Sequence, residues 1–394
     1  MKKIIGIFVC ILLIMAALPA MGIAITNEEN FSHDENDDLK TPNYTPDTIL
    51  LTTLWGQWAP YNTKCPIDPD TGNPHRLGCW SVAIGQIIRF HELQSHGLVE
   101  YFYQNKDGDL IPLVNNLNDF DYDWNYMSDV LNGSSSPEEL DHVSQILYDT
   151  ATVIQKNFGH GDYVLTPSKM VDEIIDHFQY ISVQTEVEDL PDIEEIKDEI
   201  DGYRPCMLYL EKTTGGGHAV VIDGWRERRD FEVHLNFGWK GDNNSWYVYN
   251  ESILDYDDNN MRKVIFIRIA PNKPQKPAGP LTGSPGIEHD FTTTTTVKNE
   301  LPIYYKWDWD DGTFSDWLGR YDSGEICEAS HIWKEKGKYS IRVKARDING
   351  WESPWSDPLA IEMPRNRITT NNLMMRFLQQ FPLLQLLLQR LGLQ

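Results

Sequence analysis

The clearest helical pattern in the chain lies between Gly78 and His91. Apolar residues recur there at intervals of three and four, as in a helix that buries one face: Trp80, Ala83, Ile84, Ile87 and Ile88. The same kind of pattern, with proline at two of the starts, predicts three later helices, at 137 to about 158, from Pro167 onward, and over 193–200.

After residue 205 the pattern changes to short apolar runs separated by turn residues, which is typical of strands. The predicted strands cover 206–210, 219–225, 231–236, 246–249 and 263–269. Another short strand is expected at 99–103. Helices followed by an antiparallel sheet predict an α+β domain over residues 48–270.

A proline-rich linker over 271–282 precedes a second region with turn signals between short apolar runs. Strands are expected at 291–297, 303–309, 331–333 and 339–347, and Asn349-Gly350 is a hairpin-turn sequence. Roughly seven short strands in about ninety residues predict a small immunoglobulin-like β-sandwich over 283–364.

The two ends of the chain do not fit either domain. Residues 1–24 have a positive start, an apolar core and small residues near the end, which predicts a secretory signal peptide. Residues 25–47 are acidic and poor in apolar side chains, so they are expected to form a spacer. The apolar tail over 365–394 is interrupted by Gln and Arg and is too short to span a bilayer well. Docking on the protein, lying in a membrane interface and sorting all remain open for it.

Charge narrows the range of partners. The 394 residues carry a formal net charge of −25, which argues against binding to nucleic acid or to an anionic membrane surface. We expect a secreted, extracellular or cell-surface protein without a transmembrane span in its mature form. Cys10 lies in the signal peptide, and the sequence leaves open whether Cys65 and Cys206 form a disulfide.

The candidate chemistry centres on Cys79, at the predicted start of the first helix. Free N–H groups and the positive end of the helix dipole there favour a thiolate. His218 follows three glycines and stands 139 residues later, at the entrance of a short buried strand. Papain-like enzymes place their Cys and His about 130–150 residues apart, with Trp or Tyr directly after the Cys. Gly78-Cys79-Trp80 fits the local part of that pattern.

Three further residues are candidates for supporting roles. Gln57 lies between aromatic residues and could donate to an oxyanion, although taken alone it reads more readily as an ordinary loop glutamine. A hairpin would bring Asn236 back beside His218, where its amide oxygen could fix the imidazole tautomer. Trp239 could shield that hydrogen bond from water, or be a core aromatic residue in a glycine turn.

These motifs resemble the streptopain family, a group of papain-fold secreted cysteine peptidases. The resemblance rests on Gly-Cys-…-Ala-Ile-Gly-Gln-Ile-Ile-…-His, Gly-Gly-His-Ala-Val-Val-Ile-Asp-Gly and His-Leu-Asn-Phe-Gly-Trp-Lys-Gly, in that order within about residues 48–270. It implies Cys79 as nucleophile, His218 as general base and acid, Asn236 as orienting residue and Gln57 as oxyanion donor. We assign Trp239 and Gly217 to substrate binding or shielding.

The second domain resembles the PKD family through Trp-Asp-Trp-Asp-Asp-Gly-Thr and Gly-Lys-Tyr-Ser-Ile-Arg-Val-Lys-Ala-Arg-Asp. Such modules imply binding to a cell surface or an extracellular polymer, or mere spacing. The sequence therefore predicts a secreted cysteine endopeptidase acting on proteins or peptides, with no metal and no cofactor. The alternatives are a non-catalytic adhesion protein with a papain-like domain and another Cys-dependent acyl transferase.

Overall fold

The computed structural model describes residues 45–159, 165–259, 262–298, 301–364, 379–381 and 390. The expected signal peptide, most of the acidic spacer and nearly all of the apolar tail lie outside the described residues. Among the residues that are described, no helix combines the length and the apolar character needed to cross a membrane.

The first domain contains four α-helices in its described part: α2 (Cys79–His91), α3 (Pro137–Val153), α4 (Pro167–His177) and α5 (Ile193–Asp201). A capping box between Ser136 and Glu139 starts α3. This helix ends at Val153, five residues earlier than the sequence pattern predicts, because the chain turns at Gln155, whose φ is 51°. The apolar residues that follow are still buried, but they pack from a loop.

Two short 3-10 helices and a two-stranded ribbon complete the helical part of this domain: η1 (Leu117–Asp119), η2 (Trp124–Tyr126), β1 (Leu98–Gln104) and β2 (Leu110–Asn116). The ribbon is antiparallel. The sequence pattern indicated only its first strand.

The other half of the domain is a six-stranded antiparallel sheet with the order β3-β8-β4-β5-β6-β7. Its strands are β3 (Glu186–Asp189), β4 (Cys206–Glu211), β5 (Gly217–Glu227), β6 (Phe231–Asn236), β7 (Ser245–Val248) and β8 (Lys263–Phe266). Alternate residues of the central strands enter two different core clusters: Met207, Ala219 and Val221 on one face, Leu208, Val220 and Ile222 on the other. The sheet is therefore buried on both faces, which explains the unbroken apolar run in β5.

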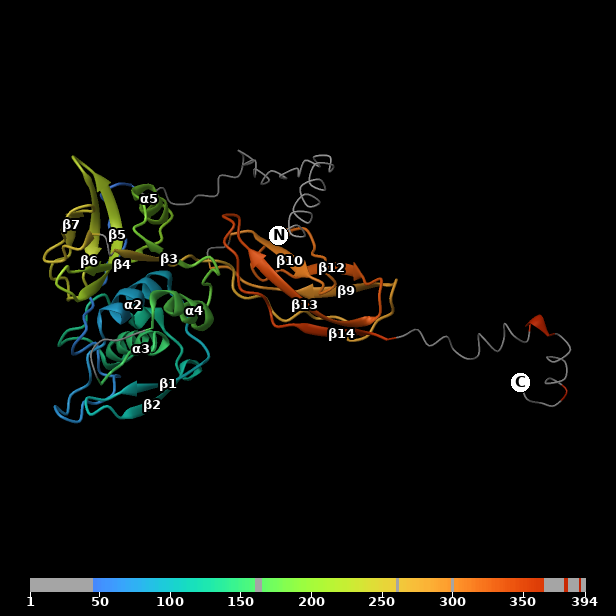
Figure 1. Cartoon of the computed structure of the whole chain (residues 1–394), viewed down its shortest axis with the longest axis horizontal. Helices are drawn as coiled ribbons and strands as arrows, with labels where there is room; N and C mark the ends of the chain where they lie inside the picture. Colours follow the sequence, from blue (N-terminus) through green and yellow to red (C-terminus); the bar gives the residue numbers. More distant parts are fainter. Residues whose placement is uncertain are drawn as a thin grey trace, which may run out of the picture. The chain divides into compact units, whose positions relative to one another are not determined.

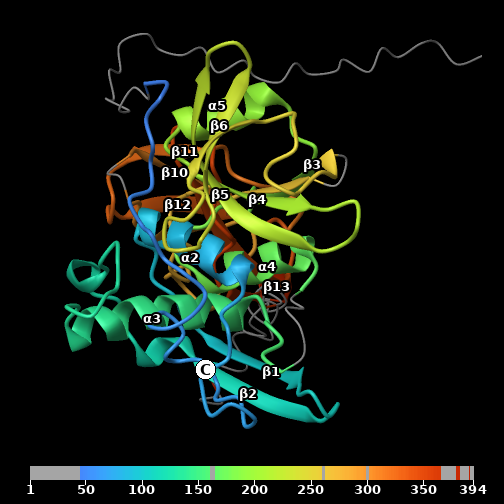
Figure 2. The same cartoon turned by 90° about the vertical axis from the view of Figure 1, so that its left-hand side faces the viewer.

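Helix α2 lies between this sheet and α3, as Figures 1 and 2 show. Its apolar face supplies fully buried side chains to the core, among them Val82, Ile84, Ile87 and Ile88. Burial of each such side chain stabilises the fold by about 1.5–3 kcal/mol. The start of α2 is thus held rigidly against β4 and β5.

The second domain is a β-sandwich of two antiparallel sheets, β11-β10-β13-β14 and β12-β9. Its strands are β9 (Glu288–Thr293), β10 (Ile303–Asp308), β11 (Leu318–Tyr321), β12 (Cys327–Ile332), β13 (Gly337–Arg346) and β14 (Leu359–Met363). Asn349-Gly350 does form a turn, but β14 begins only at residue 359. The core between the sheets contains Phe291, Tyr305, Trp307 and Trp333, all fully buried. The predicted fold class, an α+β domain followed by a small sandwich, is confirmed.

Candidate active site

Cys79 is the first residue of α2 and lies partly buried where the helix meets the sheet. The residue before it, Gly78, has a φ of 84°, a left-handed conformation that favours glycine. Because Gly78 provides no side-chain cap, the first N–H groups of the helix remain available to the thiol. The N–H groups of Cys79 and Trp80 hydrogen-bond the Cys79 sulfur, and so does the N–H of Ala219 on β5.

His218 directly precedes Ala219, so the thiol and the imidazole belong to two adjoining elements. The imidazole is 4% exposed. Its Nε2 lies 2.9 Å from the carbonyl oxygen of Phe237. Since a carbonyl oxygen can only accept, Nε2 carries the proton in the neutral ring, and Nδ1 keeps its lone pair. A base of this kind can take a proton from a thiol.

Aromatic rings surround His218. The centroid of Trp239 lies 4.5 Å from that of the imidazole, and those of Phe237 and Tyr256 lie at 5.8 and 6.0 Å. Burial among these rings lowers the pKa of His218 to about 4, with the Phe237 hydrogen bond opposing the shift and the charge of Arg76 adding to it.

The thiol responds to its surroundings in the opposite direction. Burial raises the pKa of Cys79, although the three N–H donors and the charge of Arg76 all lower it. The N–H groups at the helix start therefore act in the direction that the sequence predicts, but burial, which the sequence does not reveal, has the larger effect. The sequence reveals the helix start but not how deeply the sulfur lies. Burial and the N–H donors thus act on the thiol pKa in opposite directions.

Gln57 lies in the loop that precedes α2. This loop contacts both the start of α2 and the segment that follows β6. Its carbonyl oxygen accepts a hydrogen bond of 3.1 Å from the N–H of Leu77. Its neighbour Gly56 forms a β-bridge with Trp239. The loop therefore brings Gln57 beside the start of α2, on the side from which Trp239 approaches His218.

Gly217 is the first residue of β5 and is exposed. A Cβ atom added there would lie 2.2 Å from the hydroxyl oxygen of Tyr209 and 2.5 Å from the carbonyl oxygen of Leu210. Only glycine fits at this position beside His218. The predicted assignment of Gly217 to substrate binding is not tested by this steric requirement.

The expected contact between Asn236 and His218 is wrong in this structure. The side-chain oxygen of Asn236 accepts from Gln86 at 3.3 Å and from the N–H of Gly238 at 3.0 Å. Its amide nitrogen donates to the carbonyl oxygen of Thr53 at 2.7 Å. The register pairs Asn236 with Val221, three residues beyond His218, so the main chain of Phe237 takes the position next to the imidazole.

Sequence reasoning missed three residues around this site. Gln86 bridges Thr53 and Asn236 and is fully buried. Its signal in the sequence is a polar residue seven positions after Cys79, on the buried face of α2. Tyr209 stacks on Trp80 with centroids 5.1 Å apart. Neither it nor Tyr256 carries a signal in the sequence, because one contact depends on the position of β4 against α2 and the other on a loop between β7 and β8.

The three other cysteines that the structure describes are buried free thiols: Cys65, Cys206 and Cys327. Cys65 belongs to the core cluster on the helical side, whereas Cys206 belongs to the cluster on the far side of the sheet. The sheet therefore separates the two residues, and the disulfide that the sequence left open is not formed.

One group of acidic residues lies away from Cys79. The carboxylate oxygens of Glu186, Glu188 and Glu195 lie within 4.8 Å of one another. Arg268 forms ion pairs with Glu186 and Glu195, so the group already has a cationic partner. Burial, and after it Glu188, raises the pKa of Glu195 to about 7.

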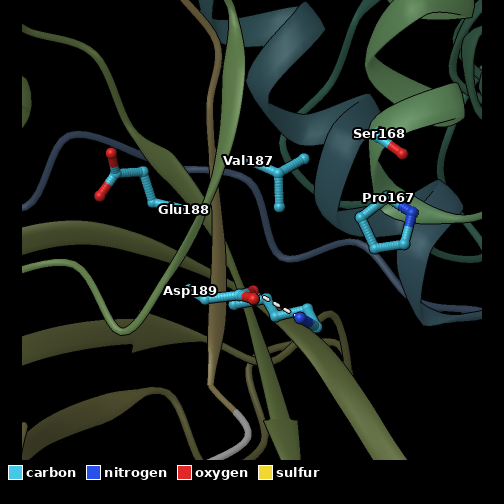
Figure 3. Close-up of a pocket in the computed structure, with 6 residues that line it drawn as sticks. Pro167, Ser168, Val187, Glu188 and Asp189 are labelled. Carbon is cyan, nitrogen blue, oxygen red and sulfur yellow. Dashed lines mark hydrogen bonds and ion pairs between the residues drawn. The ribbon is translucent and has the colours of Figure 1, made fainter. Parts of the chain in front are cut away.

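Beside this group lies a shallow pocket between α4 and β3, drawn in Figure 3. Val187 lies on the same side of β3 as Pro167 and Ser168, whereas Glu188 points to the opposite side. An ion pair between Asp189 and Lys263 closes one end. The pocket contains neither a cysteine nor a histidine, so it is separate from the chemistry at Cys79.

The α+β fold, with a cysteine at the start of the central helix and a buried histidine on the adjoining strand, defines the first domain as a papain-like cysteine peptidase domain. Residues 55–247 match the family model described as the Peptidase C10 family.

The chain is similar to the thiol protease/hemagglutinin PrtT of Porphyromonas gingivalis, with 27% identity over 219 residues, which are 54% of this chain and 24% of that protein. It is also similar to streptopain of Streptococcus pyogenes, with 24% identity over 207 residues, covering 48% of this chain and 51% of that protein. The chain thus spans about a quarter of the length of the first relative and about half of the length of the second.

A solved structure, the PKD domain of an M14-like peptidase from Thermoplasmatales archaeon SCGC AB-540-F20, is similar to another part of the chain. It is 41% identical over 24% of this chain and 97% of that domain, with a TM-score of 0.23.

Proposed function

We propose that this protein is a secreted cysteine endopeptidase that hydrolyses peptide bonds in proteins or peptides through Cys79 and His218. The observation that carries the proposal is the placement of the Cys79 sulfur against the N–H of Ala219, the residue that follows His218. This contact joins the start of α2 to the start of the strand that carries His218.

The chemistry follows from the hydrogen bond to Phe237, which leaves Nδ1 of His218 without a proton. The unprotonated Nδ1 of His218 takes the proton of Cys79 as the sulfur attacks the scissile carbonyl carbon. Gln57 and the N–H of Cys79 donate hydrogen bonds to the oxygen as it becomes negative. The imidazolium then gives its proton to the leaving amine, which leaves a thioester on Cys79. Water, deprotonated by His218, attacks the thioester carbon and the C–S bond breaks, which frees the second product as the imidazolium returns the proton to the Cys79 sulfur.

Other parts of the proposal concern the arrangement of the chain. We propose that the catalytic domain extends over 48–270 and the PKD-like sandwich over 283–364, with the sandwich acting as a binding or spacing module. Secretion is supported by the signal-peptide pattern of residues 1–24.

The test is to treat the purified protein with an epoxide that alkylates papain-type thiols and to measure digestion of casein in parallel. Cys79→Ala and His218→Ala are the informative variants, and Cys65→Ala is the matched control for a buried thiol. We expect labelling of Cys79 that requires His218, together with casein cleavage.

Two other outcomes would assign the protein to other classes. Labelling at Cys79 without cleavage of any protein would point to another acyl transfer. Folded, reduced protein that shows no His218-dependent labelling would remove the catalytic reading and leave an adhesion protein with an inactive papain-like domain.

A further inference from the structure

The rim of the candidate active site carries an aromatic ring that the solvent reaches. Trp58 directly follows Gln57, and its side chain is 58% exposed. Trp55, three residues earlier, is fully buried. Burying an aromatic side chain is favourable, so a ring left in water at the edge of a catalytic site is unusual and available for contact with a ligand.

One cationic side chain contacts this ring, and a second one is bonded to the next residue of the loop. The Cζ of Arg76 lies 5.7 Å from the centroid of Trp58, in the range of a cation–π contact. Arg76 stands three residues before Cys79. The Nζ of Lys240 donates to the carbonyl oxygen of Ala59, the residue after Trp58, at 2.9 Å and lies 5.7 Å from the centroid of the Tyr61 ring. Lys240 directly follows Trp239, the ring that covers His218.

Backbone contacts fix these residues at one edge. Leu77, next to Arg76, donates to Gln57, and the N–H of Lys240 donates to Trp55 at 3.0 Å. The stem of Lys240 packs on Gly56, where a Cβ atom would lie 2.8 Å from its Cγ. Arg76, Trp58 and Lys240 therefore form one rim, which we call the cationic rim.

The reaction geometry indicates which part of a substrate meets this rim. His218 must protonate the leaving amine, so the residues after the scissile bond leave the site on the side of His218 and Trp239. Trp239 bridges to Gly56, and the cationic rim continues directly from that bridge. A substrate side chain one or two residues after the scissile bond can reach it.

The charge of the rim contrasts with that of the protein, whose formal net charge is −25. Arg76 also lowers the pKa of both Cys79 and His218, after the larger effect of burial on each, which places its charge close to the catalytic pair. A guanidinium has five N–H donors and an ammonium has three, so each group can bind a carboxylate in addition to the partners that it already has.

We propose that Trp58, Arg76 and Lys240 form a subsite for a carboxylate in the segment that follows the scissile bond, so that the enzyme prefers an acidic residue there. The proposal rests on the peptidase function proposed above and adds a substrate class to it. Trp58 would pack on the methylene groups of the acidic side chain while the two cations bind its charge.

The test uses the full chain and a peptide library randomised at the two positions after the scissile bond, with amidated C-termini. Asp and Glu should be enriched in the cleaved peptides by about tenfold over Asn and Gln, as expected for one charge-assisted hydrogen bond. Arg76→Gln combined with Lys240→Gln should abolish the enrichment, and Arg76→Glu should shift it toward Lys and Arg. Lys263→Gln, which removes a cation beside the separate pocket, should leave it unchanged.

A second set with free C-termini separates an acidic side chain from the carboxylate of a chain end. If the enzyme prefers only peptides with free C-termini, the rim binds the carboxylate of a chain end, and the proposed preference for acidic side chains is wrong. Cleavage without preference for acidic residues would overturn the subsite and leave the peptidase intact. If wild-type protein cleaves no peptide, the proposed function fails instead. The subsite is then tested separately by measuring how tightly Cys79→Ala protein binds a Glu peptide and the matching Gln peptide. The subsite predicts that the Glu peptide binds more tightly and that this difference is lost when Arg76 is also replaced.

Discussion

Two buried histidines on neighbouring strands of the same sheet have opposite surroundings. His218, on β5, has aromatic rings around it and a single hydrogen bond, to a main-chain carbonyl. His234, on β6, bonds through Nδ1 to the carboxylate of Asp223 at 2.6 Å, and Asp223 is completely buried. Trp246 lies edge-on to its ring.

The difference shows what makes a buried histidine available for catalysis. The carboxylate of Asp223 occupies a ring nitrogen of His234 and holds it in one arrangement. His218 keeps one nitrogen without a proton and stands beside the strand residue that contacts Cys79. The chemistry therefore depends on which partner each ring has, since both rings are buried to a similar degree.

Replacing each histidine by glutamine should separate the two roles most strongly. His218→Gln should lower kcat/KM for a peptide substrate by about 10³-fold, because the general base and acid is lost. His234→Gln keeps an N–H donor for Asp223 and should leave kcat/KM nearly unchanged. Steady-state kinetics checks both variants, with circular dichroism to confirm that each is folded. Equal losses in the two variants would contradict the comparison.

The Asp223–His234 pair should matter for stability instead. His234→Leu leaves the buried carboxylate without its partner, so the free energy of unfolding should fall by about 3–5 kcal/mol. Removing both groups, in Asp223→Leu with His234→Leu, should restore much of that loss, because no charge is left buried. Urea unfolding measures both. If the double variant is no more stable than His234→Leu, the loss does not come from a buried charge left without its partner, and this prediction is wrong.

The sequence was sufficient to predict much of this comparison. Cys79, His218 and the α+β fold follow from a helical period, a glycine loop before an apolar run, and their separation in the chain. The apolar run of β5 was recognisable because the strand is covered on both faces. The role of Gln57 as an oxyanion donor was favoured only by the family resemblance, and it stays a prediction.

What the sequence did not predict depends on register and depth. The position of Asn236 requires the pairing of β5 and β6, and a bulge between Ile222 and Gly224 shifts that register. The direction of the pKa shift of Cys79 requires the burial of its sulfur, which no local pattern reports. The exposure of Trp58 beside the buried Trp55 is likewise a property of the packed loop.

Acid should affect His218 in a defined window. Its folded-state pKa of about 4 lies below the ordinary value of 6.5, so the unfolded chain takes up a proton first as the pH falls. Stability from the neutral ring is therefore complete above pH 6.5 and declines as the pH falls toward 4, by about 3 kcal/mol in total.

His218→Phe is the variant that isolates this effect, since its ring stays apolar at every pH. Between pH 7 and pH 4.5 the free energy of unfolding should fall less in this variant than in the wild type. His91, whose pKa burial lowers to about 3, adds a loss of the same sign and is present in both proteins. Equal losses in both proteins would mean that His218 is not held neutral.

The smallest expected effect on catalysis concerns Asn236. It tests directly the finding that Asn236 does not bond to His218. Its side chain connects Thr53, Gln86 and Gly238, so Asn236→Ala should lower stability by about 1–3 kcal/mol through buried groups left unpaired. Because the Phe237 carbonyl still orients His218, kcat/KM measured on folded protein should fall by less than about tenfold, which is less than the loss from the base itself. Gln86→Ala is the matched control, since it removes a member of the same network that lies on the helix. A loss near that of His218→Gln in Asn236→Ala, with Gln86→Ala active, would return Asn236 to the orienting role that the family resemblance implies.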